Sequence, residues 1–201
     1  MIASGVGRTL RFMPDTLTPA FSTRIPEGDT HARAVCDACG YVAYENPKIV
    51  TGSLVVHEGQ VLLCRRAIEP RRGFWTLPAG YLELGETVGE GAAREAMEEA
   101  GAAITLDGVL AFYSIARIGQ VQIIYRARFI GPPVFAAGVE SLDVRLFPWD
   151  GIPWDELAFP SVHWSLQAWR AVGDGPLGAP AGNPAHDPLG ATPVTLVAAG
   201  L

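Results

Sequence analysis

Three glutamates in the middle of the chain, Glu95, Glu98 and Glu99, stand at a spacing that suits phosphate chemistry. At positions i, i+3 and i+4 of a helix they share one face, and the small residues between them fall on the other. Carboxylates gathered in this way repel one another unless hard divalent cations lie among them, and Mg²⁺ prefers oxygen ligands. The spacing therefore indicates a metal site, although a solvated acidic helix face fits the helix alone equally well.

The helix that would carry these glutamates is predicted over residues 87–100. Thr87 and Glu90 fit a capping box, in which a hydroxyl and a carboxylate bond the free amides of the first turn. Gly101 suits the left-handed residue that ends a helix. Gly80 begins the loop that leads into this helix, and Glu86 lies near the end of that loop.

The glutamates belong to a longer pattern. Gly80 is followed by five residues and Glu86, then by seven residues and the run Arg-Glu-Ala-Met-Glu-Glu-Ala-Gly-Ala at 94–102. Every fixed position of the Nudix box is matched, so the sequence resembles the Nudix hydrolase family. The resemblance implies an α/β fold, namely an α/β/α sandwich with a mixed β-sheet between helices. It also implies hydrolysis of the pyrophosphate in a nucleoside diphosphate linked to another group.

The resemblance assigns roles to the residues of the box. Glu95, Glu98 and Glu99 match the metal-binding glutamates, with Mg²⁺ or Mn²⁺ as the expected cofactor. The backbone carbonyl of Ala79 is a further expected ligand. Arg94 matches the arginine that orients the glutamates by ion pairing. The bound metal would neutralise the pyrophosphate and activate a water molecule.

The general base varies within the family, so several candidates stay open. A glutamate of the box is one choice, either Glu98 or Glu86. An acidic residue on a later loop is the other, either Glu140 or Asp143. Each of the two later residues is also compatible with an ordinary charge on a loop surface.

Substrate-binding candidates precede the box. Arginine guanidinium groups suit phosphate oxygens, and Arg65, Arg66 and Arg72 are the candidates here. Trp75 is the candidate for stacking on a base. Surface positions for some of the arginines and a place in the core for an aromatic residue are the alternatives.

A longer resemblance points to one branch of the family. It runs over residues 36–40, 44–48, 73–83, 141–147 and 157–159, and it is similar to FAD pyrophosphatases and ADP-ribose pyrophosphatases that carry an N-terminal zinc ribbon. It implies cleavage of FAD to FMN and AMP, or of ADP-ribose to AMP and ribose phosphate. The Ser-Gln-Pro-Trp run typical of NADH pyrophosphatases is absent from the sequence, which disfavours NADH as the main substrate.

The sequence departs from this branch at the ribbon. The branch has two Cys-x-x-Cys pairs, whereas only Cys36 and Cys39 stand here. A structural zinc site normally has four ligands. Two interpretations therefore stay open: the two cysteines bind zinc, or the knuckle keeps its turn without a metal.

The rest of the chain divides by pattern. We expect an irregular lead-in over 1–30, a zinc-ribbon-like knuckle over 31–48, a catalytic domain over 49–172 and a flexible Gly/Pro/Ala-rich tail over 173–201. Within the catalytic domain, a hairpin is predicted with strands at 49–57 and 61–66. Further strands are predicted at 75–77, 109–116, 121–130 and 144–148, and helices at 154–159 and 161–172.

Composition narrows the class of protein. The 201 residues carry a net charge of −6, which argues against nucleic acid as a partner and leaves a small nucleotide substrate open. The sequence shows neither an apolar run long enough for a membrane span nor the pattern of a signal peptide. We therefore expect a cytoplasmic protein without a membrane partner. A homodimer is also compatible. The alternative functions are a sanitising hydrolase of oxidised nucleoside triphosphates and a non-catalytic sensor of an ADP-ribose-like ligand.

Overall fold

The structure is a computed structural model that describes residues 20–185, and the chain divides into two compact units at Asn46–Pro47. The smaller unit contains an antiparallel sheet of β1 (Phe21–Arg24), β2 (Arg33–Cys36) and β3 (Val42–Ala43) in the order β1-β2-β3. The irregular lead-in predicted over residues 1–30 is therefore wrong for residues 21–24. They form a strand because they pair with β2, from Phe21 opposite Cys36 onward, and such a partner is not visible in the local sequence. Residues 1–19 of that lead-in lie outside the described residues.

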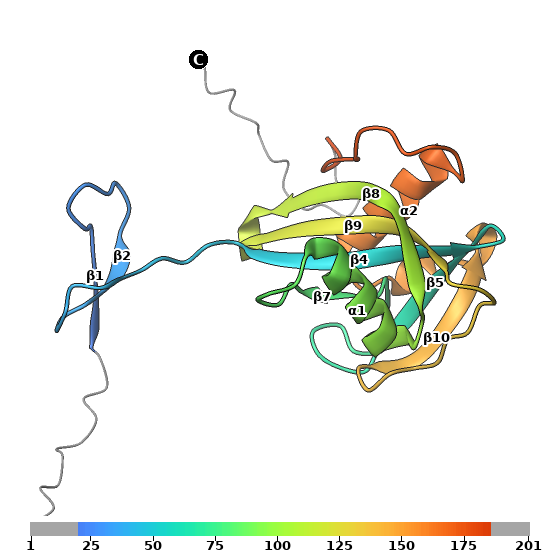
Figure 1. Cartoon of the computed structure of the whole chain (residues 1–201), viewed down its shortest axis with the longest axis horizontal. Coiled ribbons are helices and arrows are strands. Elements are labelled where there is room, and N and C mark those ends of the chain that lie inside the picture. The colour runs from blue at the N-terminus through green and yellow to red at the C-terminus, as the bar shows by residue number, and fades with distance from the viewer. Residues whose placement is uncertain (1–19, 186–201) are drawn as a thin grey trace, which may run out of the picture. The chain divides into compact units, whose positions relative to one another are not determined.

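The larger unit is built on a mixed seven-stranded sheet (Figure 1). The main path is β10-β5-β4-β9-β8, with β6 paired to β5 and β7 paired to β4. The pair β4–β9 is parallel and the others are antiparallel. The strands are β4 (Lys48–His57), β5 (Gln60–Arg66), β6 (Trp75–Thr76), β7 (Ala79–Tyr81), β8 (Ile104–Ile115), β9 (Gln120–Phe129) and β10 (Ser141–Pro148).

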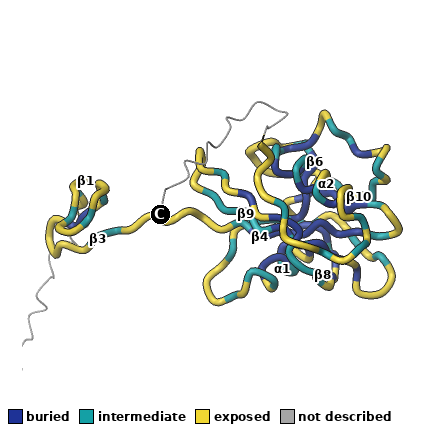
Figure 2. Tube along the Cα trace, turned by 90° about the horizontal axis from the view of Figure 1, so that it is seen from above, coloured by how far each residue is buried: buried dark blue, intermediate teal, exposed yellow. Residues whose placement is uncertain are grey.

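One helix covers each face of this sheet. Helix α1 (Val88–Ala100) packs its alanines against Val55 and Leu62, whereas α2 (Pro160–Val172) packs Leu166 against Leu54 and Leu63. Successive residues of β4 thus enter two different cores, which explains why residues 51–56 are buried without interruption (Figure 2). The predicted α/β/α sandwich with a mixed sheet is confirmed.

The predicted hairpin is formed by β4 and β5. Val56 pairs with Val61 and His57 with Gln60, which leaves Glu58 and Gly59 as a two-residue turn. Both turn residues have positive φ, 48° and 74°. This is the geometry of the turns that match the twist of two-residue hairpins, and glycine adopts it at little cost.

The helix predicted over residues 154–159 is wrong. Only a single 3₁₀ turn, η3 (Trp154–Glu156), forms there, after the similar turns η1 (Ala116–Ile118) and η2 (Trp149–Gly151). Beyond it the chain is extended because Leu157 bridges to Trp75 and the Ala158 amide donates to the Trp75 carbonyl at 2.8 Å. Pairing with β6 therefore replaces the helical bonds. The strand predicted from residue 109 also begins earlier, at Ile104, because its first residues pair with the end of β9.

The flexible tail predicted over residues 173–201 is wrong for its first part, residues 173–185. Ala181 forms a parallel bridge with Ala111 of β8. Its amide donates to Leu110 O at 2.9 Å, and the Phe112 amide donates to Ala181 O at 2.8 Å. The segment thus pairs with the edge of β8, where backbone groups would otherwise lack partners in the sheet. Residues 186–201 lie outside the described residues.

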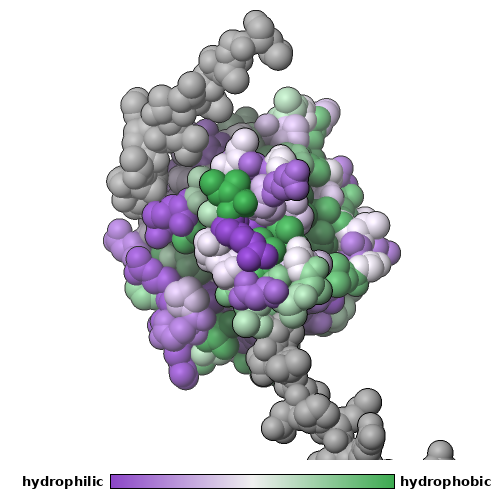
Figure 3. All heavy atoms as spheres, turned by 90° about the vertical axis from the view of Figure 1, so that its left-hand side faces the viewer, coloured by the Kyte–Doolittle hydropathy of each residue, from purple (hydrophilic) through white to green (hydrophobic). Residues whose placement is uncertain are grey.

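Hydrophilic side chains surround smaller hydrophobic groups on the face drawn in Figure 3. No helix within residues 20–185 is long and apolar enough to cross a membrane.

Candidate active site

Helix α1 begins and ends as predicted. The Thr87 hydroxyl accepts from the Glu90 amide at 3.2 Å, and the Glu90 carboxylate accepts from the Thr87 amide at 2.7 Å. Gly101 ends the helix with a φ of 58°. The Thr51 hydroxyl donates to the Val88 carbonyl at 2.8 Å, so the first turn is also bonded to the central strand β4. These bonds set the position of the glutamates relative to the sheet.

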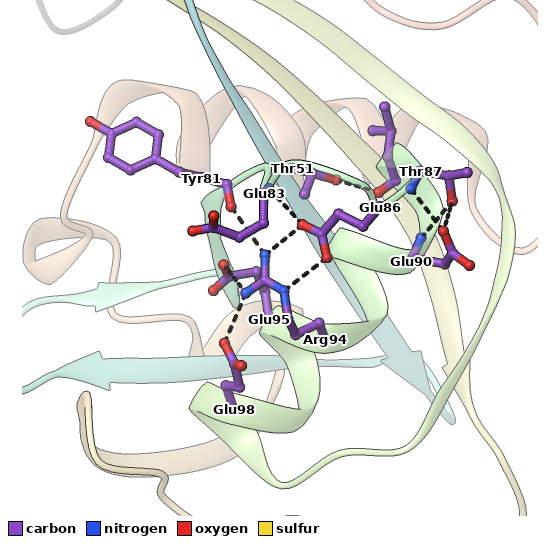
Figure 4. A network of polar contacts seen from close by, with 10 residues as sticks. Thr51, Tyr81, Glu83, Glu86, Thr87, Glu90, Arg94, Glu95 and Glu98 are labelled. Atoms are coloured by element: carbon purple, nitrogen blue, oxygen red, sulfur yellow. Dashed lines mark hydrogen bonds and ion pairs between the residues drawn. The ribbon is translucent and has the colours of Figure 1, made fainter.

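Arg94 pairs with three acidic side chains, one from the loop before α1 and two from α1 itself (Figure 4). It donates twice to Glu86, at 2.9 and 2.7 Å, once to Glu95 at 2.8 Å and once to Glu98 at 2.8 Å. A further bond of 3.0 Å reaches the Tyr81 carbonyl. The guanidinium holds the pKa of Glu86 down at about 2, so this carboxylate stays charged and keeps Arg94 in place. Arg94 thus joins the loop residue Glu86 to two of the box glutamates, Glu95 and Glu98.

Two of the box glutamates are buried. The whole residues are 8% exposed for Glu95 and 7% for Glu99. Loss of solvent raises the pKa of Glu95, and it raises the pKa of Glu99 to about 8 even though the Ala79 amide donates to Glu99 at 3.1 Å. Gly80 lies against the Glu95 carboxylate, and a Cβ at this position would come within 2.3 Å of an Oε1 atom. A side chain at residue 80 would therefore displace the Glu95 carboxylate from this position.

This set of donors fits a hard divalent cation. Glu95 and Glu99 are buried acids at raised pKa, and no ion pair to Glu99 occurs within residues 20–185. A cation bound by oxygen ligands would offset the cost of ionising both acids. As the side chains stand in this part of the chain, no three acidic, histidine or cysteine groups converge as a metal site, and Arg94 pairs with Glu95 and Glu98.

A cavity of about 1450 Å³ opens over these groups. Its lining includes the charged side chains of the box together with Arg66, namely Glu95, Glu98, Glu99, Arg94 and Arg66. The lining also includes neutral polar and aromatic side chains, among them Tyr81, Gln120, Gln122, Trp164 and Asn183, as well as the charged Arg117. A cavity lined by both charged and neutral polar groups suits a substrate with a pyrophosphate and an uncharged organic part.

The two candidates for the general base on the later loop, Glu140 and Asp143, lie in different places in the structure. Glu140 lies at the cavity, and its charge contributes to the raised pKa values of Glu95 and Glu99. Asp143 lies on β10 away from the cavity lining and pairs with Arg145 at 2.6 Å. The structure therefore brings Glu140, and not Asp143, to the box.

The candidates for substrate binding also differ in whether they line the cavity. Arg66 lines the cavity and stands over the Phe159 ring at 5.2 Å, with its Nε bonded to Pro70 O at 2.8 Å. Arg65 instead donates to the Gly73 carbonyl at 2.8 Å, and Arg72 is exposed; neither lines the cavity. The stacking prediction for Trp75 is wrong, because this residue is 5% exposed and packs in the core.

Several cavity residues were not predicted. Gln120 and Gln122 alternate along β9 and so share one face, which is a weak signal that the sequence does contain. Trp164 lies in the predicted helix 161–172 without a pattern that marks it. Asn183 has no local signal, because its place depends on pairing with β8.

The smaller unit contains the two remaining cysteines of the knuckle. Cys36 is buried at the end of β2, and Cys39 is exposed. The Gly40 amide closes the turn by donating to the Cys36 carbonyl at 2.9 Å. The Cys39 and Ala38 amides lower the pKa of the Cys36 thiol, which favours the thiolate form that binds metals. Within residues 20–185, no further histidine, cysteine or acidic side chain joins these two cysteines in a group that could hold a metal ion.

The fold and the box define a Nudix domain, and family comparison agrees. A NUDIX domain model matches residues 47–167, and a Nudix N-terminal zinc-ribbon model matches residues 19–45. The first match covers more than half of the chain, so the chain belongs to the Nudix hydrolase family. Enzymes of this family generally use divalent metals.

Individual relatives of the chain are also hydrolases or pyrophosphatases by name. A NUDIX hydrolase of known structure from Nitrosomonas europaea is 40% identical, with a TM-score of 0.78 over 84% of this chain and 97% of its own. An ADP-ribose pyrophosphatase from Methanocaldococcus jannaschii is 29% identical over 59% of this chain and 71% of its length. The NAD-capped RNA hydrolase NudC of Stutzerimonas stutzeri is 31% identical over 61% of this chain, which spans only 46% of that relative. The chain is thus a Nudix hydrolase, and its relatives include an ADP-ribose pyrophosphatase.

Proposed function

We propose that the chain hydrolyses ADP-ribose or FAD with Mg²⁺ or Mn²⁺, giving AMP together with ribose phosphate or FMN. The observation that carries the proposal is the pair of buried, mutually repelling acids, Glu95 and Glu99, in the lining of a cavity large enough for a dinucleotide. The 29% identity to an ADP-ribose pyrophosphatase supports this substrate class.

The residues of the box would hold the metal. Glu95, Glu98 and Glu99 supply carboxylate oxygens, and the carbonyl of Ala79 is the further proposed ligand. Metal bound there would neutralise the pyrophosphate and make water a stronger nucleophile. Arg94 keeps Glu95 and Glu98 oriented, since Glu86 holds the guanidinium from its other side.

The chain's own groups would direct the remaining steps. Arg66, at the cavity beside Glu99, would bind phosphate oxygens. Glu140 would take a proton from the attacking water, whose oxygen bonds to one phosphorus while the bridging P–O bond breaks. The second phosphate leaves with that bridging oxygen, so the two products are phosphate monoesters.

A substrate panel tests the proposal. ADP-ribose, FAD, NADH and 8-oxo-dGTP are compared at one Mg²⁺ concentration for the unaltered chain and for Glu98→Gln. Glu156→Gln is the matched control, because Glu156 is exposed on η3. We expect ADP-ribose or FAD to have the highest kcat/KM and Glu98→Gln to lose at least about 10- to 100-fold in kcat. A preference for 8-oxo-dGTP would instead identify a sanitising hydrolase, and no turnover of any substrate would favour a sensor.

Zinc in the smaller unit is a separate proposal. Cys36 and Cys39 would supply two of its ligands, as the match to the Nudix N-terminal zinc-ribbon model supports. The division of the chain after Asn46 and the start of the NUDIX domain match at residue 47 support the proposed domain limits, with a ribbon that ends near Asn46 and a catalytic domain that begins at Pro47.

A further inference from the structure

Residues 173–185, called here segment 173–185, lie beyond the region that the NUDIX domain model matches. They follow α2 and run beside β8, where Ala181 bridges to Ala111. The segment is held at its start by Arg126, which donates to the carbonyls of Gly173 and Gly175 at 2.8 and 2.7 Å. Leu177 packs against the core cluster under α2. The segment is therefore bound to the catalytic unit at several places.

Asn183 connects this segment to the cavity. Its side-chain Oδ1 accepts from the Ser114 amide at 2.8 Å, and its Nδ2 donates to the Ser114 carbonyl at 3.1 Å. Asn183 and Ser114 both line the large cavity. One amide side chain thus satisfies both backbone groups of a cavity residue at the edge of the sheet.

The cavity lining around Gln120 and Gln122 contains several neutral hydrogen-bonding groups, and Arg117 is also part of the cavity lining. Gln122 Nε2 donates to Gln120 Oε1 at 3.2 Å, and Gln120 Nε2 donates to the Tyr81 hydroxyl at 3.2 Å. Trp164 adds an aromatic surface. Amides and flat rings suit a nucleobase, which is planar, neutral and carries both donors and acceptors. The carboxylates and Arg66 suit the pyrophosphate instead.

We propose that the nucleoside part of the substrate binds at the cavity lining around Gln120 and Gln122, and that segment 173–185 builds its wall through Asn183. This inference rests on the proposed hydrolysis of a nucleoside diphosphate derivative. Asn183 is a positioning residue: it acts on the nucleoside by holding Ser114 and the edge of β8. The segment is thus a determinant of substrate specificity outside the Nudix box.

The test compares Asn183→Ala with Gly178→Ala in the full chain. Gly178 is the matched control in the same segment, because a Cβ there would meet nothing within 4 Å. Steady-state kinetics with ADP-ribose measure the effect of each substitution on KM and on kcat separately. Calorimetric titration measures binding of AMP, which contains a nucleoside, and of inorganic pyrophosphate, which does not.

For Asn183→Ala we expect KM for ADP-ribose to rise about tenfold with kcat within about twofold, because neutral hydrogen bonds are lost away from the reacting atoms. AMP binding should weaken by the same factor, and pyrophosphate binding should not change. Asn183→Asp keeps the acceptor for the Ser114 amide and loses the donor, so its AMP affinity should be intermediate. Gly178→Ala should match the unaltered chain in every measurement.

Unchanged AMP binding in Asn183→Ala, or an equal loss of pyrophosphate binding, would overturn the inference. Gln122→Ala is a second variant that leaves segment 173–185 intact, and undiminished AMP binding in it would count against the nucleoside position. If the unaltered chain cleaves neither ADP-ribose nor FAD, the proposed function fails, whereas the AMP titrations still decide where a nucleoside binds.

Discussion

At the scale of single residues, Glu99 is an ionisable side chain that is buried. It lines the cavity together with Glu95, and burial raises its pKa from about 4.5 to about 8. A raised pKa means that the folded, metal-free chain binds this proton more tightly than the unfolded chain. The contribution of Glu99 to stability is therefore fully present below about pH 4.5, where it is protonated in both states, and is lost as the pH rises to about 8.

The substitution Glu99→Gln removes this penalty. With metal chelated, we expect Glu99→Gln to be as stable as the unaltered chain below about pH 4.5 and more stable at pH 9, by a free energy on the order of a few kcal/mol. Glutamine can still accept from the Ala79 amide. Urea unfolding at pH 4, 7 and 9 measures the difference. Glu156→Gln is the control, and an advantage for Glu99→Gln that is constant with pH would contradict the argument.

Residues whose role depends on near neighbours in sequence were predictable. The three box glutamates share a face because of helical spacing, and Thr87 caps the helix through a residue three positions away. Trp75 was not predictable, because its burial results from contact with Phe147 and from pairing with residues near 157. Sequence gives the chemistry of a side chain more readily than its surroundings.

At the scale of elements, the loop between β9 and β10 is bonded to the end of helix α1. The Ala136 amide donates to Ala100 O at 2.8 Å, and the Gly138 amide donates to Glu99 O at 3.0 Å. These bonds satisfy carbonyls that a helix end leaves free. They also place Glu140, two residues further on, beside the box.

Gly138→Ala should move this loop. A Cβ at residue 138 would lie 1.7 Å from the Glu98 carbonyl oxygen, which is backbone and cannot rotate away. We expect a loss of about 1–3 kcal/mol in the free energy of unfolding. Displacement of Glu140 by about 1 Å can lower kcat by about a hundredfold. Steady-state kinetics and urea unfolding measure the two effects.

Ala137→Ser is the control for this loop, because Ala137 is exposed. If Gly138→Ala lost stability but kept its kcat, the loop would not position the base, and Glu140 would lose its support as that base.

Helices and strands were predictable where the hydrophobic pattern and the turn residues lie close together in the sequence. The β4–β5 hairpin, with Gly59 at positive φ, is an example. The helix predicted over 154–159 failed because a partner strand distant in sequence bonds Ala158. The pairing of segment 173–185 with β8 was missed for the same reason. A Gly- and Pro-rich composition predicts low helix content, but it does not exclude backbone pairing.

At the scale of the catalytic unit, a buried ion pair connects the sheet to segment 173–185. Arg126 and Asp107 have side chains that are each 8% exposed, and they pair at 3.0 Å. The same guanidinium bonds the carbonyls of Gly173 and Gly175. Removing one partner of a buried pair leaves a charge without compensation.

Arg126→Gln should therefore destabilise the unit by about 3 kcal/mol and release the start of segment 173–185. Urea unfolding measures the first effect. Hydrogen–deuterium exchange measures the second, because the Phe112 and Ala181 amides bond across β8 and the segment and should exchange faster.

Arg128→Gln is the matched control, since Arg128 pairs with the same Asp107 but its side chain is 67% exposed. Exposed pairs contribute less than about 1 kcal/mol, so this variant should keep both its stability and its slow exchange. Equal losses in the two variants would mean that the charge on Asp107, and not the bonds to Gly173 and Gly175, determines stability. Fast exchange at Phe112 in Arg126→Gln alone, accompanied by a raised KM for ADP-ribose, would connect this ion pair through segment 173–185 to the cavity.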